Sequence, residues 1–272
     1  MEISTISKDL LFSTVRIETK DLKDSYVGTG FVFEYKSALF LVTAKHNIKN
    51  MLSGSLTFTQ ARDGKPLIGT RYTLGLDDLE QLWFVHPDDA IDVAVVPFSN
   101  ILKYAKDQEG VDLYYCPISS SILPTEETLK VIDAFEEIIF IGYSGGLWDK
   151  VNLLPIIRKG ITATPIAVDF EGKKEFLIDA SSFPGSSGSP VFLYRIGIYH
   201  HSSGAIAMGK HLIFLGLIQN AYFVRETGRE GVQSQPVADK PEKSSPEWID
   251  LGIVLKYSTI IETIEAHFLK KR

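Results

Sequence analysis

The chain has 272 residues, of which 44% are hydrophobic, and it carries a formal charge of −6 at pH 7. This length and composition suit a soluble globular protein with one large domain or two small ones. Nucleic acid is not expected as a partner, because the charge is acidic and the only basic cluster is the terminal Lys270, Lys271 and Arg272.

The sequence lacks the signals of a disulfide framework, a zinc site or a membrane segment. Cys116 is the single cysteine, and no group of Cys and His residues has the spacing of a structural zinc site. No window approaches about 18 uncharged apolar residues, and the N-terminus does not resemble a secretion signal. We therefore expect a cytoplasmic protein with no cofactor, no metal and no membrane partner. No feature indicates an oligomeric state.

Short apolar segments rich in Val, Ile, Phe and Tyr, separated by turn residues, predict many antiparallel strands. In chain order, the clearest are residues 26–35, 38–44, 92–98, 136–143, 157–168, 174–180, 189–194 and 212–224. Long amphipathic helices do not alternate with these segments, which disfavours a parallel α/β sheet. The sequence therefore predicts an all-β fold of the barrel or sandwich type.

A short helical stretch near "NILKYAKDQEGVDLYY" separates two strand-rich halves, and we expect their junction between about residues 100 and 135. We predict a β-barrel at 1–115, a second at 116–257 and a helix at 258–272. In this helix, Thr259 and Glu262 are expected to form a capping box.

The segment "FPGSSGSPVF" places three serines within four positions, fenced by glycines. Glycine lets the backbone direct N–H groups into a site, where they stabilise the oxyanion of a tetrahedral intermediate. We therefore assign the nucleophile to Ser187, between Gly185 and Gly188, with the amides of Gly185 and Ser187 as the oxyanion hole. Ser186 and Ser189 lack this glycine bracket.

A serine hydroxyl needs a base, and the base works best when a carboxylate orients it. His46 follows an apolar strand in "LVTAKHNI", and Asp92 begins another in "HPDDAIDVAVVPF". His86 is a rival base, although it lies only six residues before Asp92. Asp88 or Asp89 is a rival acid, in the preceding polar turn.

The order of the three residues along the chain bears on the enzyme class. An α/β-hydrolase has a G-x-S-x-G elbow, and its serine precedes the acid and the histidine. Here the order is His46, Asp92, Ser187, and Ser189 stands where the second glycine of the elbow belongs. Both features argue against that class.

Five segments, in this order, resemble the trypsin-like (chymotrypsin-fold) serine peptidases of the bacterial branch that includes HtrA-type and glutamyl endopeptidases. They are "GTGFVF", "TAKH", "DVAVV", "IGY" and "IDASSFPGSSGSPVF", within a resemblance over about residues 25–256. The resemblance implies two antiparallel six-stranded Greek-key β-barrels, with His46 and Asp92 from the first and Ser187 from the second. It also implies a serine endopeptidase that cleaves a peptide or protein substrate through an acyl-enzyme.

The sequence departs from parts of this family. Ser186 stands where zymogen-type digestive enzymes carry an aspartate that pairs with a newly cut N-terminus, so no such activation is expected. Only a helix follows residue 257, so a PDZ domain like that of HtrA-type enzymes is not expected.

The resemblance also implies a primary substrate pocket. Its expected lining is Ser181, Ser182, Ile218, Gln219 and Asn220. Ile218 stands where a glutamyl endopeptidase has histidine, and neither serine offers a negative charge for Lys or Arg. We therefore expect an uncharged substrate residue in this pocket. The polar, proline-containing segment 227–248 is predicted to be a mobile loop that acts as a flap over the substrate cleft.

A second hypothesis is a catalytically latent or inactive trypsin-fold module that binds peptides or partner proteins. Such modules usually lack one triad member, whereas His46, Asp92 and Ser187 are all present, so the sequence favours the peptidase. The remaining candidates have plainer interpretations. His200, His201 and His211 are expected to be solvated in a Gly/Ser-rich loop, and Cys116 to be a small apolar core residue.

Overall fold

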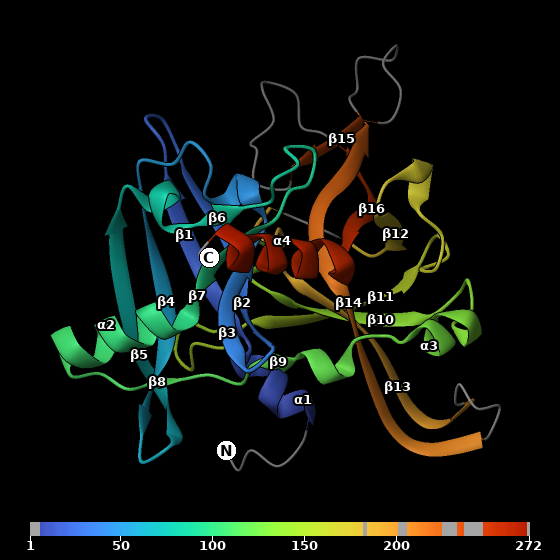
Figure 1. Ribbon diagram of the computed structural model, residues 1–272, viewed down its shortest axis with the longest axis horizontal. Coiled ribbons are helices and arrows are strands. Elements are labelled where there is room, and N and C mark those ends of the chain that lie inside the picture. The colour runs from blue at the N-terminus through green and yellow to red at the C-terminus, as the bar shows by residue number, and fades with distance from the viewer. Residues whose placement is uncertain (1–5, 182–183, 201–205, 225–232, 237–246, 271–272) are drawn as a thin grey trace.

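Two β-sheets make up most of the computed structural model, which describes residues 6–181, 184–200, 206–224, 233–236 and 247–270 (Figure 1). Their strands pair antiparallel, except that β9 pairs with β2 in parallel. The first sheet contains β1 (Thr14–Lys20), β2 (Ser25–Tyr35), β3 (Ala38–Thr43), β4 (Ser53–Arg62), β5 (Lys65–Asp77), β6 (Phe84–Val85), β7 (Ala94–Pro97), β8 (Leu113–Tyr114) and β9 (Ile118–Ser119). The second contains β10 (Glu137–Gly142), β11 (Ile156–Thr162), β12 (Glu175–Asp179), β13 (Pro190–His200), β14 (Ile206–Val224), β15 (Gln233–Pro236) and β16 (Glu247–Lys256).

The second sheet closes on itself. Its strands follow the order β13-β10-β11-β12-β16-β14, and pairing of β13 with β14 completes a barrel of six strands, to which β15 adds as a seventh. The main path of the first sheet is β5-β4-β1-β2-β3-β7-β6. Together with a C-terminal helix, these sheets confirm the predicted all-β architecture.

Four α-helices lie among the described residues: α1 (Ile6–Asp9), α2 (Phe98–Glu109), α3 (Glu126–Val131) and α4 (Tyr257–Lys270). None of the helices in this described part has the length and apolar content to cross a bilayer. The predicted capping box is wrong, because Thr259 lies inside α4 and its hydroxyl donates back to the carbonyl of Lys256 at 2.8 Å. Glu262 pairs with Lys174 at 2.5 Å and is not bound to the start of the helix.

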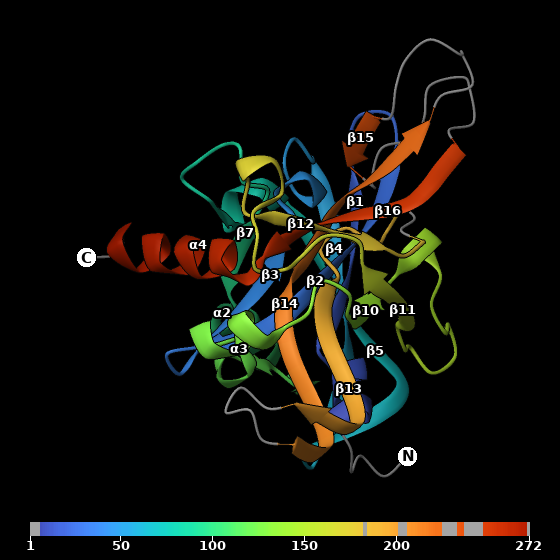
Figure 2. The ribbon, with the colours of Figure 1, turned by 90° about the vertical axis from the view of Figure 1, so that its right-hand side faces the viewer.

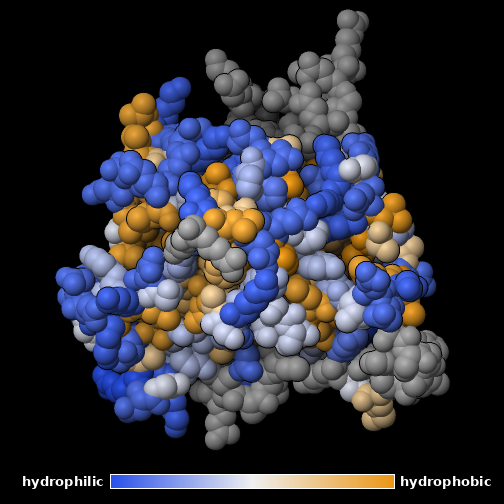
Figure 3. Space-filling model, viewed as in Figure 1, coloured by the Kyte–Doolittle hydropathy of each residue, from blue (hydrophilic) through white to orange (hydrophobic). Residues whose placement is uncertain are grey.

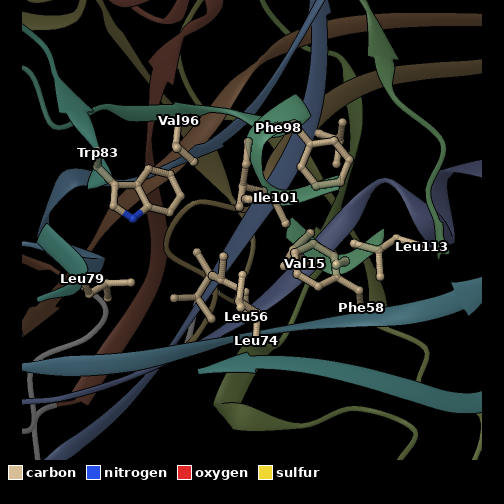
Figure 4. Packing of buried hydrophobic residues seen from close by; sticks show 14 of the residues in the cluster. Val15, Leu56, Phe58, Leu74, Leu79, Trp83, Val96, Phe98, Ile101 and Leu113 are labelled. Atoms are coloured by element: carbon tan, nitrogen blue, oxygen red, sulfur yellow. The ribbon is translucent and has the colours of Figure 1, made fainter. Parts of the chain in front are cut away.

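Three apolar clusters hold the molecule together, and one of them joins the two sheets. The cluster in Figure 4 fills the first sheet beneath α2, where Phe58 and Phe98 lie with ring centroids 5.9 Å apart. In the joining cluster, Phe214 of β14 contacts Phe31 and Phe33 of β2, with ring centroids 5.5 and 5.6 Å apart. Polar side chains cover most of the outer face seen in Figure 3, with apolar patches between them.

The hairpin formed by β13 and β14 is longer than the sequence predicts. The strand expected at 189–194 continues to His200, and the strand expected at 212–224 begins at Ile206, with Arg195 opposite His211 and Gly197 opposite Gly209. The added residues include isoleucine and tyrosine, which favour strands, and cross-strand pairing accommodates the facing glycines. His201 lies outside the described residues, as does most of the predicted flap at 227–248.

Candidate active site

Three segments bring His46, Asp92 and Ser187 together. His46 lies in a 3-10 turn, Lys45–Asn47, just after β3, and Asp92 lies just before β7. Ser187 lies in the loop between β12 and β13. The distance is 2.6 Å from Asp92 Oδ2 to His46 Nδ1, and 2.6 Å from His46 Nε2 to Ser187 Oγ. The three side chains form an unbroken chain of contacts.

Strand pairing explains why His46 meets Asp92. β3 and β7 are antiparallel neighbours, with Thr43 opposite Ala94, so the end of one strand lies beside the start of the other. The backbone continues this pairing, since the N–H of Lys45 donates to the carbonyl of Asp92 at 3.2 Å. The N–H of His46 donates to Asp92 Oδ1 at 2.8 Å. Both carboxylate oxygens of Asp92 therefore contact His46, and only 9% of the residue is exposed.

The loop that carries Ser187 is bound by groups from the first sheet. The Ser187 carbonyl accepts hydrogen bonds from the Thr29 N–H at 2.9 Å and from Asn47 Nδ2 at 3.0 Å. Ser187 Oγ also lies 2.8 Å from the Gln219 carbonyl oxygen, which is a second acceptor for its single proton besides His46 Nε2. Sequence reasoning missed Thr29 and Asn47, although each stands inside or beside a recognised motif, "GTGF" and "TAKH".

Gly185 takes a conformation that only glycine adopts readily. Its φ is +94°, and a Cβ added there would lie 2.3 Å from the Tyr143 carbonyl oxygen. The Gly185 carbonyl accepts a hydrogen bond from Thr29 Oγ1 at 2.9 Å, and the Pro184 carbonyl accepts one from the Gly145 N–H at 2.5 Å. Within the described part of the chain, the N–H groups of Gly185 and Ser187 have no acceptor.

A turn at Ser144–Gly146 supports this loop from the second barrel. Ser144 Oγ lies 2.6 Å from Ser186 Oγ, so the two hydroxyls share a hydrogen bond. Arg16 of β1 stabilises this turn. Its guanidinium group donates to the Gly146 carbonyl at 3.1 Å and lies over the Tyr143 ring. Burial raises the pKa of Tyr143 to about 12, so its hydroxyl stays neutral. Sequence reasoning missed Ser144, which follows the recognised "IGY" segment.

The rival acids and base have other contacts. The Asp88 N–H donates to His86 Nδ1 at 3.0 Å, and His86 Nε2 lies 3.7 Å from Glu262 of α4. Asp89 is exposed and lies 3.5 Å from Lys45 Nζ. In the structure, it is His46 and Asp92 that lie beside Ser187.

The residues predicted to line the primary pocket are only partly described. Ser181 is half-buried, and Ser182 lies outside the described residues. The Ile218 side chain packs in the core of the second barrel. Gln219 and Asn220 line a pocket of about 540 Å³. A second pocket, of about 530 Å³, adjoins Pro184 and Gly185.

The fold has relatives among solved structures. A variant of the HtrA-type protease AlgW with tripeptide has a TM-score of 0.50 at 14% identity, over 96% of this chain and 61% of that chain. A serine endoprotease from Yersinia pestis has a TM-score of 0.50 at 14% identity, over 100% of this chain and 70% of that one. These likenesses show a chymotrypsin-like fold of the HtrA type. The chain spans about 61% of the length of the AlgW variant.

Sequence comparison reaches the family by a separate route. No curated protein matches the chain. The family model for the trypsin-like peptidase domain, however, matches residues 28–197, which is more than half of the sequence. The chain therefore belongs to the trypsin-like peptidase domain family.

Proposed function

We propose that the protein is a serine endopeptidase in which Ser187 is the nucleophile, His46 the base and Asp92 the acid that orients it. The observation that carries the proposal is the unbroken chain from Asp92 through His46 to Ser187, with both side-chain contacts at 2.6 Å. A serine, a histidine and a buried carboxylate in this arrangement activate the hydroxyl for attack on an acyl carbon.

In the proposed reaction, Ser187 Oγ attacks the carbonyl carbon of a peptide bond while His46 Nε2 takes its proton. Asp92 Oδ2 holds the imidazole at Nδ1 and stabilises its charged form, while Oδ1 accepts the backbone N–H of His46. The N–H groups of Gly185 and Ser187 stabilise the oxyanion. His46 then gives its proton to the leaving amine, and water, activated by His46, hydrolyses the acyl-enzyme.

Two further observations support the oxyanion role. The carbonyls of Pro184 and Gly185 are both bound to other groups, so neither competes for the N–H groups of Gly185 and Ser187.

A peptide as substrate is supported by the tripeptide present with the AlgW variant, which shares the fold. The half-buried Ser181 brings no charge, consistent with an uncharged residue in the primary pocket.

The test is the intact mass of the protein after reaction with a small fluorophosphonate probe, which labels activated serines. We expect one adduct on the wild type and none on Ser187→Ala, because this hydroxyl lies 2.6 Å from His46 Nε2. Ser186→Ala is the matched control and should still be labelled, since its hydroxyl contacts Ser144.

A folded wild type that forms no adduct would contradict the proposal and favour the latent binding module. An adduct on Ser187→Ala would show that the nucleophile is another residue. Circular dichroism of each variant establishes that it has folded, and no large loss of stability is expected from removing one hydroxyl from this loop.

A further inference from the structure

The pocket of about 540 Å³ lies beside the candidate active site. One of its lining residues is Gln219, whose carbonyl lies 2.8 Å from Ser187 Oγ. Other parts of its wall come from the segment just before Asp92, from β12, from β16 and from α4. When a substrate binds at Ser187, the side chains on either side of its reacting bond therefore lie within reach of this pocket.

The pocket contains a buried carboxylate without a partner. Glu175, the first residue of β12, is only 9% exposed, and no hydrogen-bond donor or cation contacts its carboxylate among the described residues. Burial raises the pKa of Glu175 and is the largest effect. The charge of Lys173 lowers the pKa by less, and the charge of Glu171 raises it further. Such a group has lost water without gaining a compensating charge.

The other charged groups of the pocket do not compensate the negative charge of Glu175. Its walls carry four carboxylates and two ammonium groups: Asp88, Glu171, Glu175, Glu262, Lys173 and Lys174. Lys174 is already paired with Glu262 at 2.5 Å, and Lys173 is exposed. The cavity is therefore acidic and offers a binding partner to an incoming cation.

We propose that this pocket receives a lysine or arginine side chain of the substrate, and that Glu175 determines this specificity. The proposal rests on the proposed peptidase function. A cavity of about 540 Å³ has room for a long cationic side chain, which would form a charge-assisted hydrogen bond with the buried carboxylate. The basic residue occupies a different substrate position from the uncharged residue expected near Ser181.

A fluorogenic peptide library that varies the residues flanking the cleaved bond tests this specificity. We expect kcat/KM to be about tenfold higher with Lys or Arg than with norleucine at one position, which corresponds to about 1.4 kcal/mol. Glu175→Gln should reduce this preference to less than about twofold. The control Glu137→Gln, an exposed carboxylate paired with Lys159, should keep the preference.

The pocket proposal is overturned if no position prefers a basic residue, or if the preference persists in Glu175→Gln. Labelling by the fluorophosphonate separates this failure from failure of the proposed function. The probe is too small to use the pocket, so it should label both variants as it labels the wild type.

An independent observation concerns β15, which lies on the edge of β14 next to the active site. β16 pairs along one edge of β14 over residues 216–224. The opposite edge carries β13 as far as Leu217, then the Ser187 loop beside residues 218–219, and then β15 at 220–223. Figure 2 shows β15 and β16 on opposite sides of the end of β14.

Extended peptides commonly bind proteins by adding a strand to an open sheet edge. A peptide that approached Ser187 along β14 would need the hydrogen bonds of residues 220–223, which β15 already uses. We infer that β15 is an internal competitor for the substrate, again on the basis of the proposed function. Its last residue, Pro236, has no N–H to donate to Asn220, so β15 is a weak strand that a peptide displaces.

Replacing residues 233–235 with three glycines weakens β15 and tests the inference. We expect the KM of an unstructured peptide substrate to fall at least fivefold, with kcat and fluorophosphonate labelling unchanged. The control replaces residues 63–65, at the exposed turn between β4 and β5, with glycine and should leave KM unchanged.

An unchanged KM in the β15 variant, with labelling intact, would overturn the competitor role. Loss of labelling in the wild type would instead count against the peptidase function itself. Hydrogen exchange gives a second readout, since the amides of residues 220–223 should exchange faster in the β15 variant.

Discussion

At the scale of single residues, the position of Ser187 depends on both sheets. Thr29 binds the Ser187 carbonyl through its N–H and the Gly185 carbonyl through its hydroxyl. Asn47 binds the same Ser187 carbonyl from the turn that carries His46. Ser187 and His46 are therefore fixed to each other through the backbone as well as through their side chains.

Gly185→Ala should disable the oxyanion loop. The new Cβ would lie 2.3 Å from the Tyr143 carbonyl oxygen at a φ of +94°, so the loop must shift and withdraw its N–H groups. We expect kcat to fall by about 100-fold or more, the usual effect of losing an oxyanion donor.

Gly64→Ala is the control for Gly185→Ala, because Gly64 also has a positive φ, of +71°, but has nothing within 4 Å of an added Cβ. It should lose about 1 kcal/mol of stability from backbone strain and keep its kcat. Equal kcat values for the two variants would contradict the role given to Gly185.

The sequence contained enough information to name the three side chains that the structure brings together, because His46, Asp92 and Ser187 each lie in a local motif of distinct chemistry. It did not reveal Asn47, whose partner Ser187 is 140 residues away. The contact of Ser144 with Ser186 likewise joins segments 42 residues apart. Such supporting contacts depend on how the segments pack, which local sequence does not encode.

At the scale of elements, the sequence predicts secondary structure correctly where the apolar periodicity is clear. It fails where tertiary contacts determine where an element begins or ends. The strand pattern predicted the all-β fold and the terminal helix, and both are confirmed. The start of α4 was misjudged because the Thr259 hydroxyl bonds back to Lys256. The hairpin of β13 and β14 extends to His200 and Ile206 because each strand supplies the hydrogen-bond partners of the other.

α4 contacts both sheets. Its Ile260 and Ile264 are fully buried in the cluster that also contains Phe31 of the first sheet and Phe214 of the second. Its Glu265 pairs with Lys36 at 2.5 Å. The helix therefore helps to keep the segments that carry His46 and Ser187 in one arrangement.

At the scale of the whole molecule, Glu175 should make stability depend on pH. Burial raises its pKa in the folded state above the ordinary value of 4.5, so the folded protein holds this proton more tightly than the unfolded chain. The resulting stabilisation is present below about pH 4.5 and is lost as the pH rises through the raised pKa.

Glu175→Gln should therefore gain stability relative to the wild type between about pH 4 and about pH 7, measured as urea midpoints. Glu137→Gln should show no such gain, because Glu137 is an exposed carboxylate paired with Lys159. A Glu175→Gln variant that is less stable than the wild type at neutral pH would contradict the view that this carboxylate lacks a partner.

The pairing of β15 with β14 also has a consequence for the kind of polypeptide that gains access. Because β15 belongs to the same chain, its effective concentration at this edge is on the order of millimolar, whatever the protein concentration. A short peptide that pairs only along the edge competes poorly at lower concentrations. A longer unfolded segment that pairs along β14 and also places a basic side chain near Glu175 gains from both contacts at once. Under the proposed function, this arrangement favours long extended chains that make both contacts over short peptides that make one.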